Sequence, residues 1–282
     1  MSEKDFKIPK DGIVKGPICA IFAEDTVGLT STIRHHHRLG FKNILVLKRP
    51  ELNIPESCQN ICIPVDIENA FFSDISPYLN QLIKAFDGEW LYHCFNAEYL
   101  HFPFCETRYI KDFTDFITEE KRSAVFTYVL DLYPEDLGKA PDGFSLEDAY
   151  FDGAGYYGLQ RYMGGQPLER QLDIFGGLKW RFEEHTPYER RHLNRISLVK
   201  ARPDITMDAN GHFSDPELNT YSCPWHHSTT ATICSFRTAK SLKTNPGSMF
   251  EIDNFMWSKS VKFRWNSQQL LDYGFLETGQ WF

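Results

Sequence analysis

A strand-like stretch from Trp90 to Pro103 ends in polar side chains of the kind that carry out chemistry. Apolar and aromatic residues fill positions 91–95, and Asn96 and Glu98 follow in what the pattern predicts to be a polar turn. In open α/β sheets, ligands bind outside the carboxyl ends of the strands. Asn96 and Glu98 are therefore expected at the mouth of a binding crevice, provided that neighbouring segments supply parallel strands and helices.

A second group of reactive residue types lies in the third quarter of the chain. Lys200 and Arg202 are suited to hold a phosphate, because arginine offers a bidentate fork and lysine a point charge. His212, His226 and His227 can bind the same anion, ligate a metal or act as bases. Each residue taken alone is explained as well by surface salt bridges or turns. Their clustering favours a site.

The other histidines and the cysteines match no established metal motif. Histidines 35–37 lie in a predicted helix, where consecutive residues point about 100° apart and cannot all meet one ion, so one half-buried and two exposed imidazoles are expected. The seven cysteines include no Cys-x-x-Cys pair, and Cys58 and Cys62 have no further ligands near them in sequence, so buried thiols in a reducing compartment are expected. A hydrolase that used the histidines as metal ligands has little support, because no His-x-x-x-His motif occurs.

Strands and helices are expected to alternate through the first half of the chain. Hydrophobic patterning predicts a helix that Asp25 or Thr26 caps and Gly40 ends. It also predicts helices at 71–86 and 109–117, and strands at 18–23, 41–47, 61–65, 89–95, 123–132 and 231–236. This alternation is typical of a three-layer α/β domain with a largely parallel sheet.

The second half of the chain differs from the first in composition and in hydrophobic periodicity. Residues 135–180 combine glycine, aspartate and aromatic residues with little periodicity, which predicts loops and short elements. Glycines at 153–158 match Gly-x-Gly-x-x-Gly, but no apolar strand precedes them, so the match is weak. Aromatic residues in the tail, 250–282, are expected to pack the chain end onto the body or to stack on sugar rings.

Bulk properties limit the classes of partner and compartment. The chain has 282 residues, a net charge of −8 and a pI near 5.7, which argues against nucleic-acid binding. The N-terminus is charged and carries no apolar leader, and no run of 18 apolar residues occurs. A cytoplasmic protein without a membrane span is therefore expected.

Three short motifs together suggest a family. The first strand ends in Ala-Glu-Asp at 23–25, the first helix ends in His-x-x-x-Gly at 36–40, and Lys-Ala-Arg-Pro-Asp at 200–204 precedes Gly-His at 211–212. This order of features resembles the GT-A glycosyltransferases, in particular the bacterial family 2-like group that is also similar to family 92. The resemblance implies a GT-A-like three-layer α/β/α fold with an irregular, aromatic-rich C-terminal region.

The resemblance also implies a division of the chain by role. Residues 1–16 would be a polar lead-in, 17–134 the nucleotide-binding half, 135–249 a loop-rich acceptor and catalytic half of the same domain, and 250–282 the tail. In the family, an Asp-x-Asp motif holds Mg²⁺ or Mn²⁺ against the nucleotide diphosphate. Here the two aspartates fall on Phe95 and Ala97, and a shift by one residue offers Asn96 and Glu98 as ligands. Without a metal, four basic residues would neutralise the diphosphate: Lys48, Arg49, Lys200 and Arg202.

Two hypotheses of function follow. In the first, the chain transfers a sugar from a nucleotide sugar, with a UDP-sugar as the first expectation, to a hydroxyl of a carbohydrate or other acceptor. The resemblance then implies that Glu24, Asp25 and Asp66 contact the nucleotide, and that Glu98 or His212 serves as general base. In the second, the missing aspartates mean that catalysis is lost, and the domain binds a carbohydrate, a nucleotide or a protein partner.

Overall fold

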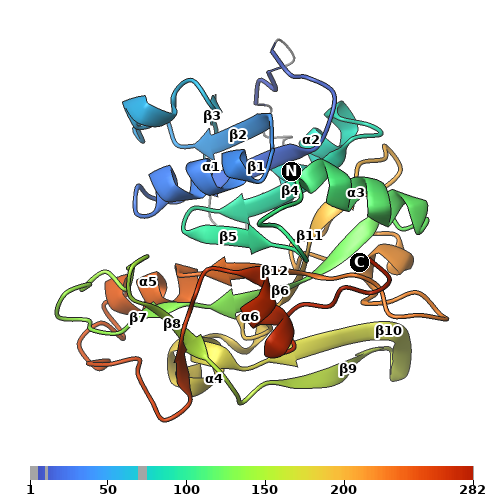
Figure 1. Ribbon diagram of the computed structural model, residues 1–282. Helices are drawn as coiled ribbons and strands as arrows, with labels where there is room; N and C mark the ends of the chain where they lie inside the picture. The colour runs from blue at the N-terminus through green and yellow to red at the C-terminus, as the bar shows by residue number, and fades with distance from the viewer. Residues whose placement is uncertain (1–5, 10–11, 69–74, 282) are drawn as a thin grey trace. The chain divides into compact units, whose positions relative to one another are not determined.

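The computed structural model describes residues 6–9, 12–68 and 75–281 (Figure 1). Backbone hydrogen bonds order eight strands as β3-β2-β1-β4-β11-β6-β12-β5. Their bounds are β1 Ile18–Ala23, β2 Asn43–Lys48, β3 Ile63–Asp66, β4 Trp90–Phe95, β5 Glu98–His101, β6 Ala124–Asp131, β11 Asn194–Lys200 and β12 Ala231–Ser235. The pairs β1–β2, β1–β4, β2–β3 and β6–β12 are parallel, whereas β4–β11 and β5–β12 are antiparallel. The expected α/β fold with a large, mostly parallel sheet is confirmed.

The chain forms two compact units, each assembled from three segments. Unit 1 comprises Met1–Asn96, Cys105–Phe126 and Ile196–Asn219, and unit 2 comprises Ala97–Phe104, Thr127–Arg195 and Thr220–Phe282. These boundaries differ from a division at residues 134 and 249, because strands distant in sequence pair with one another. The assignment of nucleotide and acceptor roles to separate regions stays a prediction.

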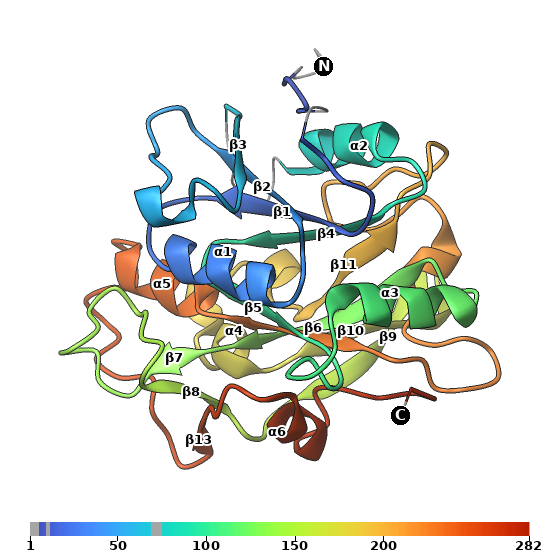
Figure 2. The ribbon, with the colours of Figure 1, turned by 45° about the horizontal axis from the view of Figure 1, so that its top comes forward.

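Unit 1 is a three-layer arrangement around β3-β2-β1-β4. Its helices are α1 Leu29–Arg38, α2 Ile75–Ala85 and α3 Ile110–Glu119. Contacts place α1 and α3 on one face of β4, since the His36 and Tyr92 rings lie 5.2 Å apart and Trp90 Nε1 donates to Thr118 Oγ1 at 3.1 Å. Figure 2 shows α2 on the opposite face of these strands. The connections β1-α1-β2 and β3-α2-β4 therefore pass over opposite faces.

The first helix differs from expectation at its start and agrees at its end. Its N-cap is Gly28, with φ +71°, and neither Asp25 nor Thr26 caps it; Asp25 accepts a hydrogen bond from the Val27 N–H instead. The helix ends as predicted at Gly40, whose φ of +92° is the left-handed conformation that favours glycine.

The histidines of this helix also correct an expectation. His35 and His36 are buried and His37 is exposed, because the helix turns two of the three imidazoles towards the sheet.

The structure differs from two further predictions for the segments on either side of β4. The helix expected at 71–86 is α2 from Ile75, and residues 71–74 lie outside the described residues. Glu98, expected on a turn, is the first residue of β5, which pairs antiparallel with β12. The turn between β4 and β5 is therefore confined to two residues, Asn96 and Ala97.

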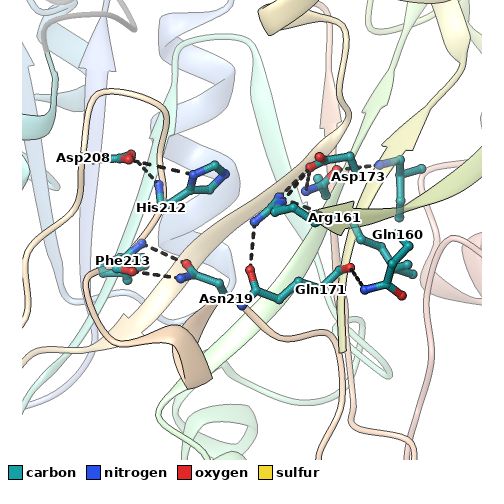
Figure 3. A network of polar contacts seen from close by, with 11 residues as sticks. Gln160, Arg161, Gln171, Asp173, Asp208, His212, Phe213 and Asn219 are labelled. Atoms are coloured by element: carbon teal, nitrogen blue, oxygen red, sulfur yellow. Dashed lines mark hydrogen bonds and ion pairs between the residues drawn. The ribbon is translucent and has the colours of Figure 1, made fainter. Parts of the chain in front are cut away.

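Unit 2 has more regular structure than its sequence suggests. Where loops were expected, β9 Tyr157–Met163 and β10 Gln166–Phe175 form an antiparallel hairpin. Most of its side chains are exposed or half-buried, so the strands lack the apolar alternation by which a strand is recognised. Figure 3 shows how Arg161 of β9 ties the hairpin by pairing with Asp173 of β10 at 2.5 Å and donating to Gln171 Oε1 at 3.3 Å.

The remaining elements of unit 2 are short. They are β7 Tyr133–Pro134, β8 Ala149–Asp152, β13 Ser260–Lys262, α4 Gly177–Arg181, α5 Arg237–Thr244 and α6 Ser267–Asp272. Single 3₁₀ turns occur at Glu56–Cys58, Glu183–His185, Tyr188–Arg190 and Pro216–Asn219 across the two units. Aromatic residues of the tail pack into the core of unit 2, where Phe263 and Phe275 contact Phe151 edge-on. Among the helices of the described residues, none has the length and apolar character that a bilayer crossing requires.

Candidate functional site

The ends of β1 and β4 meet at the point where the strand order of unit 1 reverses. The chain moves outward from β1 to β2 and β3, and then returns to place β4 on the other side of β1. The two strands are parallel, with Phe22 opposite Phe95, so their carboxyl ends lie side by side. In open α/β sheets this reversal is where ligands bind, because the flanking loops diverge to opposite faces.

Asn96 joins the two strand ends through its amide group. Its Oδ1 accepts from the Glu24 N–H at 2.9 Å, and its Nδ2 donates to Asp25 Oδ1 at 2.7 Å and to the Val27 carbonyl at 2.9 Å. The side chain is fully buried. The next residue, Ala97, has φ +62°, an uncommon conformation for a residue with a Cβ. Backbone strain of this kind concentrates at functional sites.

The neighbouring strands bring three further predicted residues to the same edge of unit 1. Lys48 ends β2 and Asp66 ends β3, and the register of the strands places them opposite each other. Lys48 Nζ lies 2.6 Å from Asp66 Oδ1, and Arg49 pairs with Glu51 at 3.3 Å. All six residues expected to contact the donor at these strand ends are thus gathered along one edge: Glu24, Asp25, Lys48, Arg49, Asp66 and Asn96.

Lys200 and Arg202 lie at the opposite edge. β11 runs antiparallel to β4 and pairs Lys200 with Trp90, the first residue of β4. A strand advances about 3.3 Å per residue, so Lys200 is about 20 Å along the strand direction from Asn96. Arg202 is held by Asp215 at 2.8 Å and Asp204 at 3.3 Å. The structure therefore does not bring these two residues to Lys48 and Arg49, and the expected four-residue diphosphate clamp is wrong.

His212 occupies an exposed turn in unit 1. Its N–H donates to Asp208 Oδ1 at 2.9 Å, and its Nδ1 lies 3.9 Å from Asp208 Oδ2 (Figure 3). The turn is attached to α2, where Asn80 exchanges two hydrogen bonds with the backbone of Met207. No described hydrogen bond or ion pair links His212 to the strand ends that Asn96 joins. Its role as general base stays a prediction.

Glu98 is a buried ion-pair partner in unit 2. Its Oε2 lies 2.6 Å from Arg195 Nη2, and its Oε1 accepts from Ser235 Oγ at 3.2 Å. The Glu98 and Arg195 side chains are 2% and 9% exposed, so water screens the pair weakly. A carboxylate held in this way is a poor general base, because its lone pairs are already engaged. Metal binding by Asn96 and Glu98 stays a prediction, and an ion there would have to displace hydrogen bonds of both side chains.

A second buried carboxylate in unit 2 has the properties that Glu98 lacks. Asp131 ends β6 and is 1% exposed. Among the described residues its Oδ1 has no hydrogen-bond partner, whereas the carboxylate accepts from the Lys179 N–H at 3.4 Å and is hydrogen-bonded by the Thr238 side chain. Burial raises the pKa of Asp131, and the charge of Lys179 opposes this only in part. Burial likewise lowers the pKa of Lys179. Buried groups whose pKa values are displaced in this way are candidates for proton transfer.

A pocket lies close by in unit 2. It has a volume of about 240 Å³ and is lined in part by Leu130, Gly155, Tyr156 and Phe275. Burial and the nearby carboxylates raise the pKa of Tyr156, and its hydroxyl has no hydrogen-bond partner.

Two glycines allow the backbone to pass between this tyrosine and the buried carboxylate. A Cβ on Gly176 would lie 2.4 Å from the ring of Tyr156, and one on Gly177 would lie 2.9 Å from Asp131 Oδ2. A buried ion pair stands in the same unit, where Asp152 Oδ2 meets Arg181 Nε at 2.9 Å.

The sequence reasoning missed Asp131, Lys179 and Tyr156. The sequence did point to Asp131, because this carboxylate lies near the end of a predicted strand, much as Asn96 and Glu98 lie after the end of another. Lys179 and Tyr156 carried no such signal, because a region without periodicity does not show which of its residues fold inward.

Comparison with known proteins assigns no family. No protein-family model matches the chain, and no curated protein is significantly similar to it. Nine solved chains are similar in structure. One of them is a "Putative Glucose-1-Phosphate Thymidylyltransferase" from Bacillus anthracis in complex with a sucrose, which is 10% identical with a TM-score of 0.31 over 84% of this chain and 79% of that one. A likeness at this level carries no conclusion about function.

Proposed function

We propose that this chain is a transferase that uses a nucleotide sugar, and specifically a glycosyltransferase. The observation that carries the proposal is the hydrogen bonding of Asn96 to Glu24, Asp25 and Val27 where the strand order of unit 1 reverses. Nucleotides bind at such reversals in doubly wound sheets. The motif resemblance to GT-A enzymes supports a sugar-linked nucleotide.

Four residues at this edge contact the donor in the proposal. The carboxylates of Glu24 and Asp25 accept hydrogen bonds from hydroxyl and amide groups of the nucleoside. Lys48 and Arg49 face the diphosphate, whose charge arginine and lysine both match. Lys200 and Arg202 are left out of the donor site, because they lie at the other end of β4.

Transfer to an alcohol needs a general base, because a hydroxyl is a weak nucleophile until its proton leaves. Within unit 2, we propose Asp131 as the proton acceptor in place of Glu98. Burial raises the pKa of Asp131, and no residue in the described part of the chain donates a hydrogen bond to its Oδ1. Glu98 is already paired with Arg195.

Ligand-induced thermal stabilisation tests the donor site. The full chain is titrated with UDP, GDP, CMP and UDP-sugars, each with and without Mn²⁺. A ligand at one hundred times its dissociation constant stabilises the fold by about 2.7 kcal/mol. The shift is expected to fall in Asp25→Asn and to persist in Asp87→Asn, an exposed aspartate before β4. No shift with any nucleotide, or an equal loss in both variants, would overturn the proposal.

A non-catalytic binding domain is the second candidate, and one observation favours it. Phe95 and Ala97 stand where the GT-A resemblance places the two metal-binding aspartates. An assay for the release of UDP from UDP-sugars distinguishes the two candidates. An enzyme releases UDP in the presence of an acceptor and loses this activity in Asp131→Asn, whereas a binding domain shows the thermal shift without turnover.

A further inference from the structure

Three side chains with soft or borderline donor atoms meet in the core of unit 1. Cys19 comes from β1, Cys94 from β4 and His36 from α1, and their donor atoms all lie within 4.8 Å of one another. All three residues are fully buried. Within the described part of the chain, this is the one group of three or more histidine, cysteine or acidic residues close enough to share an ion. We propose that it binds a single thiophilic metal ion, with Cu(I) preferred over Zn²⁺.

The imidazole is oriented as a ligand. His36 Nδ1 lies 2.8 Å from the Thr32 carbonyl oxygen. A carbonyl only accepts hydrogen bonds, so Nδ1 carries the proton and Nε2 keeps its lone pair. Nε2 in turn points to Cys94 Sγ at 4.0 Å. A histidine that donates its other ring N–H to a backbone carbonyl is the usual arrangement around protein-bound metals.

Aromatic neighbours hold the ring in this orientation. The His36 ring centroid lies 5.2 Å from that of Tyr92 and 5.9 Å from that of Phe41. A ring packed against two others that also stack on each other has little freedom to turn away from the sulfurs, so the three donors are organised before any ion arrives.

Hydrogen-bond contacts already link the three side chains, one between Cys19 and Cys94 and one between Cys94 and His36. The 4.0 Å contact between Nε2 and a thiol is at the outer limit of a hydrogen bond to sulfur. An ion would satisfy one nitrogen and two sulfurs together.

The separations are close to those a metal requires. Metal–sulfur bonds of about 2.3 Å and metal–nitrogen bonds of about 2.0 Å, at trigonal angles, put the donor atoms about 4 Å apart. The donors therefore need to move inward by well under 1 Å. Soft thiolates select Cu(I) and zinc over Mg²⁺, Mn²⁺ and Ca²⁺, which prefer oxygen. Structural zinc takes four ligands, so a buried set of three suits Cu(I) better.

Ion binding at this place has consequences for protons and for the fold. Burial and the neighbouring Cys94 raise the pKa of Cys19, so the empty site holds a thiol that must release its proton when metal binds. Affinity is therefore expected to rise with pH. The ion would link β1, β4 and α1 in the core of unit 1, which does not depend on what unit 1 binds at its edge.

Competition with a Cu(I) chelator tests the site in the full chain. Reduced, chelator-treated protein is titrated with Cu(I) held by bicinchoninate, and in parallel with Zn²⁺ and Mn²⁺. One equivalent of Cu(I) is expected to bind. Cys19→Ser and Cys94→Ser should each lower the affinity at least about tenfold, in line with the loss of a metal ligand. Cys234→Ser, a matched control in which a fully buried cysteine of unit 2 is replaced, should not.

Other outcomes would overturn the site. Half-exposed Cys223 lies 2.8 Å from His226 Nδ1, so a loss of binding in Cys223→Ser alone would place the ion on that pair instead. Failure to bind Cu(I) would also contradict it.

X-ray absorption of the loaded wild-type protein is a second measurement that needs no variant. It should show two sulfur neighbours near about 2.3 Å and one nitrogen near about 2.0 Å. A single sulfur neighbour would reject the three-residue site.

Discussion

Asn96 uses its whole amide group to hold the backbone that follows β1 against the end of β4. Asn96→Ala leaves the half-buried Glu24 N–H and Val27 carbonyl without these bonds, and unsatisfied groups cost about 1–3 kcal/mol each. The free energy of unfolding is therefore expected to fall by about 2–4 kcal/mol in urea denaturation. Asn60→Ala, at an exposed position of the same unit, serves as the control and should change it by less than about 0.5 kcal/mol. Equal effects of both changes would contradict this role for the amide.

The buried carboxylate of Asp131 is expected to lower the free energy of unfolding when it is ionised. Burial raises its pKa, so the folded protein binds this proton more tightly than the unfolded chain does. The penalty for ionising Asp131 is absent below the ordinary pKa of about 4, grows as pH rises towards the folded pKa, and is then constant. Asp131→Asn should therefore raise the melting temperature at pH 7, and the gain should shrink towards pH 4.

Calorimetry across this pH range measures the effect of Asp131→Asn, with exposed Asp87→Asn as the control. If Asp131→Asn raises the melting temperature and abolishes turnover, Asp131 serves activity and not stability. Active-site groups often lower the stability of the fold that holds them. A gain that does not vary with pH would show that the carboxyl group does not titrate as inferred.

At the scale of elements, the start of α4 depends on a close approach of backbone to a carboxylate. Gly177 has φ +61°, and a Cβ there would lie 2.9 Å from Asp131 Oδ2. Gly164 has a similar φ of +58°, with no described atom within 4 Å of a Cβ. Gly164→Ala should thus cost only the left-handed conformation, about 1–2 kcal/mol.

Gly177→Ala adds a steric clash to the same conformational cost and should destabilise the protein by about 1–3 kcal/mol more than Gly164→Ala. Paired denaturation curves measure the difference. If the two variants were equally stable, the spacing between α4 and Asp131 would not be the reason for a glycine at this position.

On the scale of the whole molecule, unit 1 is not a continuous stretch of chain. The fragment 1–134 includes every strand from β1 to β6 but lacks Ile196–Asn219, which supplies most of β11 beside β4. Without it, β4 becomes an exposed edge with apolar side chains, a feature that promotes aggregation. The fragment is expected to aggregate, and co-expression with 135–282 should restore a soluble complex, as size-exclusion chromatography would show. A monomeric, cooperatively folding fragment would contradict the interleaved units.

The strands and crossovers of the first half were predictable from sequence, because hydrophobic period and turn residues act over short distances. β1, β2 and β4 begin and end within a few residues of expectation, and Gly40 ends α1 as its position suggested. The parallel order of these strands also placed Asn96 and Asp25 at one edge. The exposed β9–β10 hairpin was missed, since its strands bury little apolar surface and so lack alternation.

What the sequence did not contain is the pairing of segments far apart along the chain. Lys200 lies at the other end of β4 because β11 runs antiparallel to it, and a strand's direction within a sheet leaves no mark on its own residues. The same holds for the burial of Glu98 against Arg195, 97 residues away, and for the meeting of Cys19, His36 and Cys94. Local propensities decide which segments are strands and helices. The burial of their apolar faces against one another decides which side chains meet.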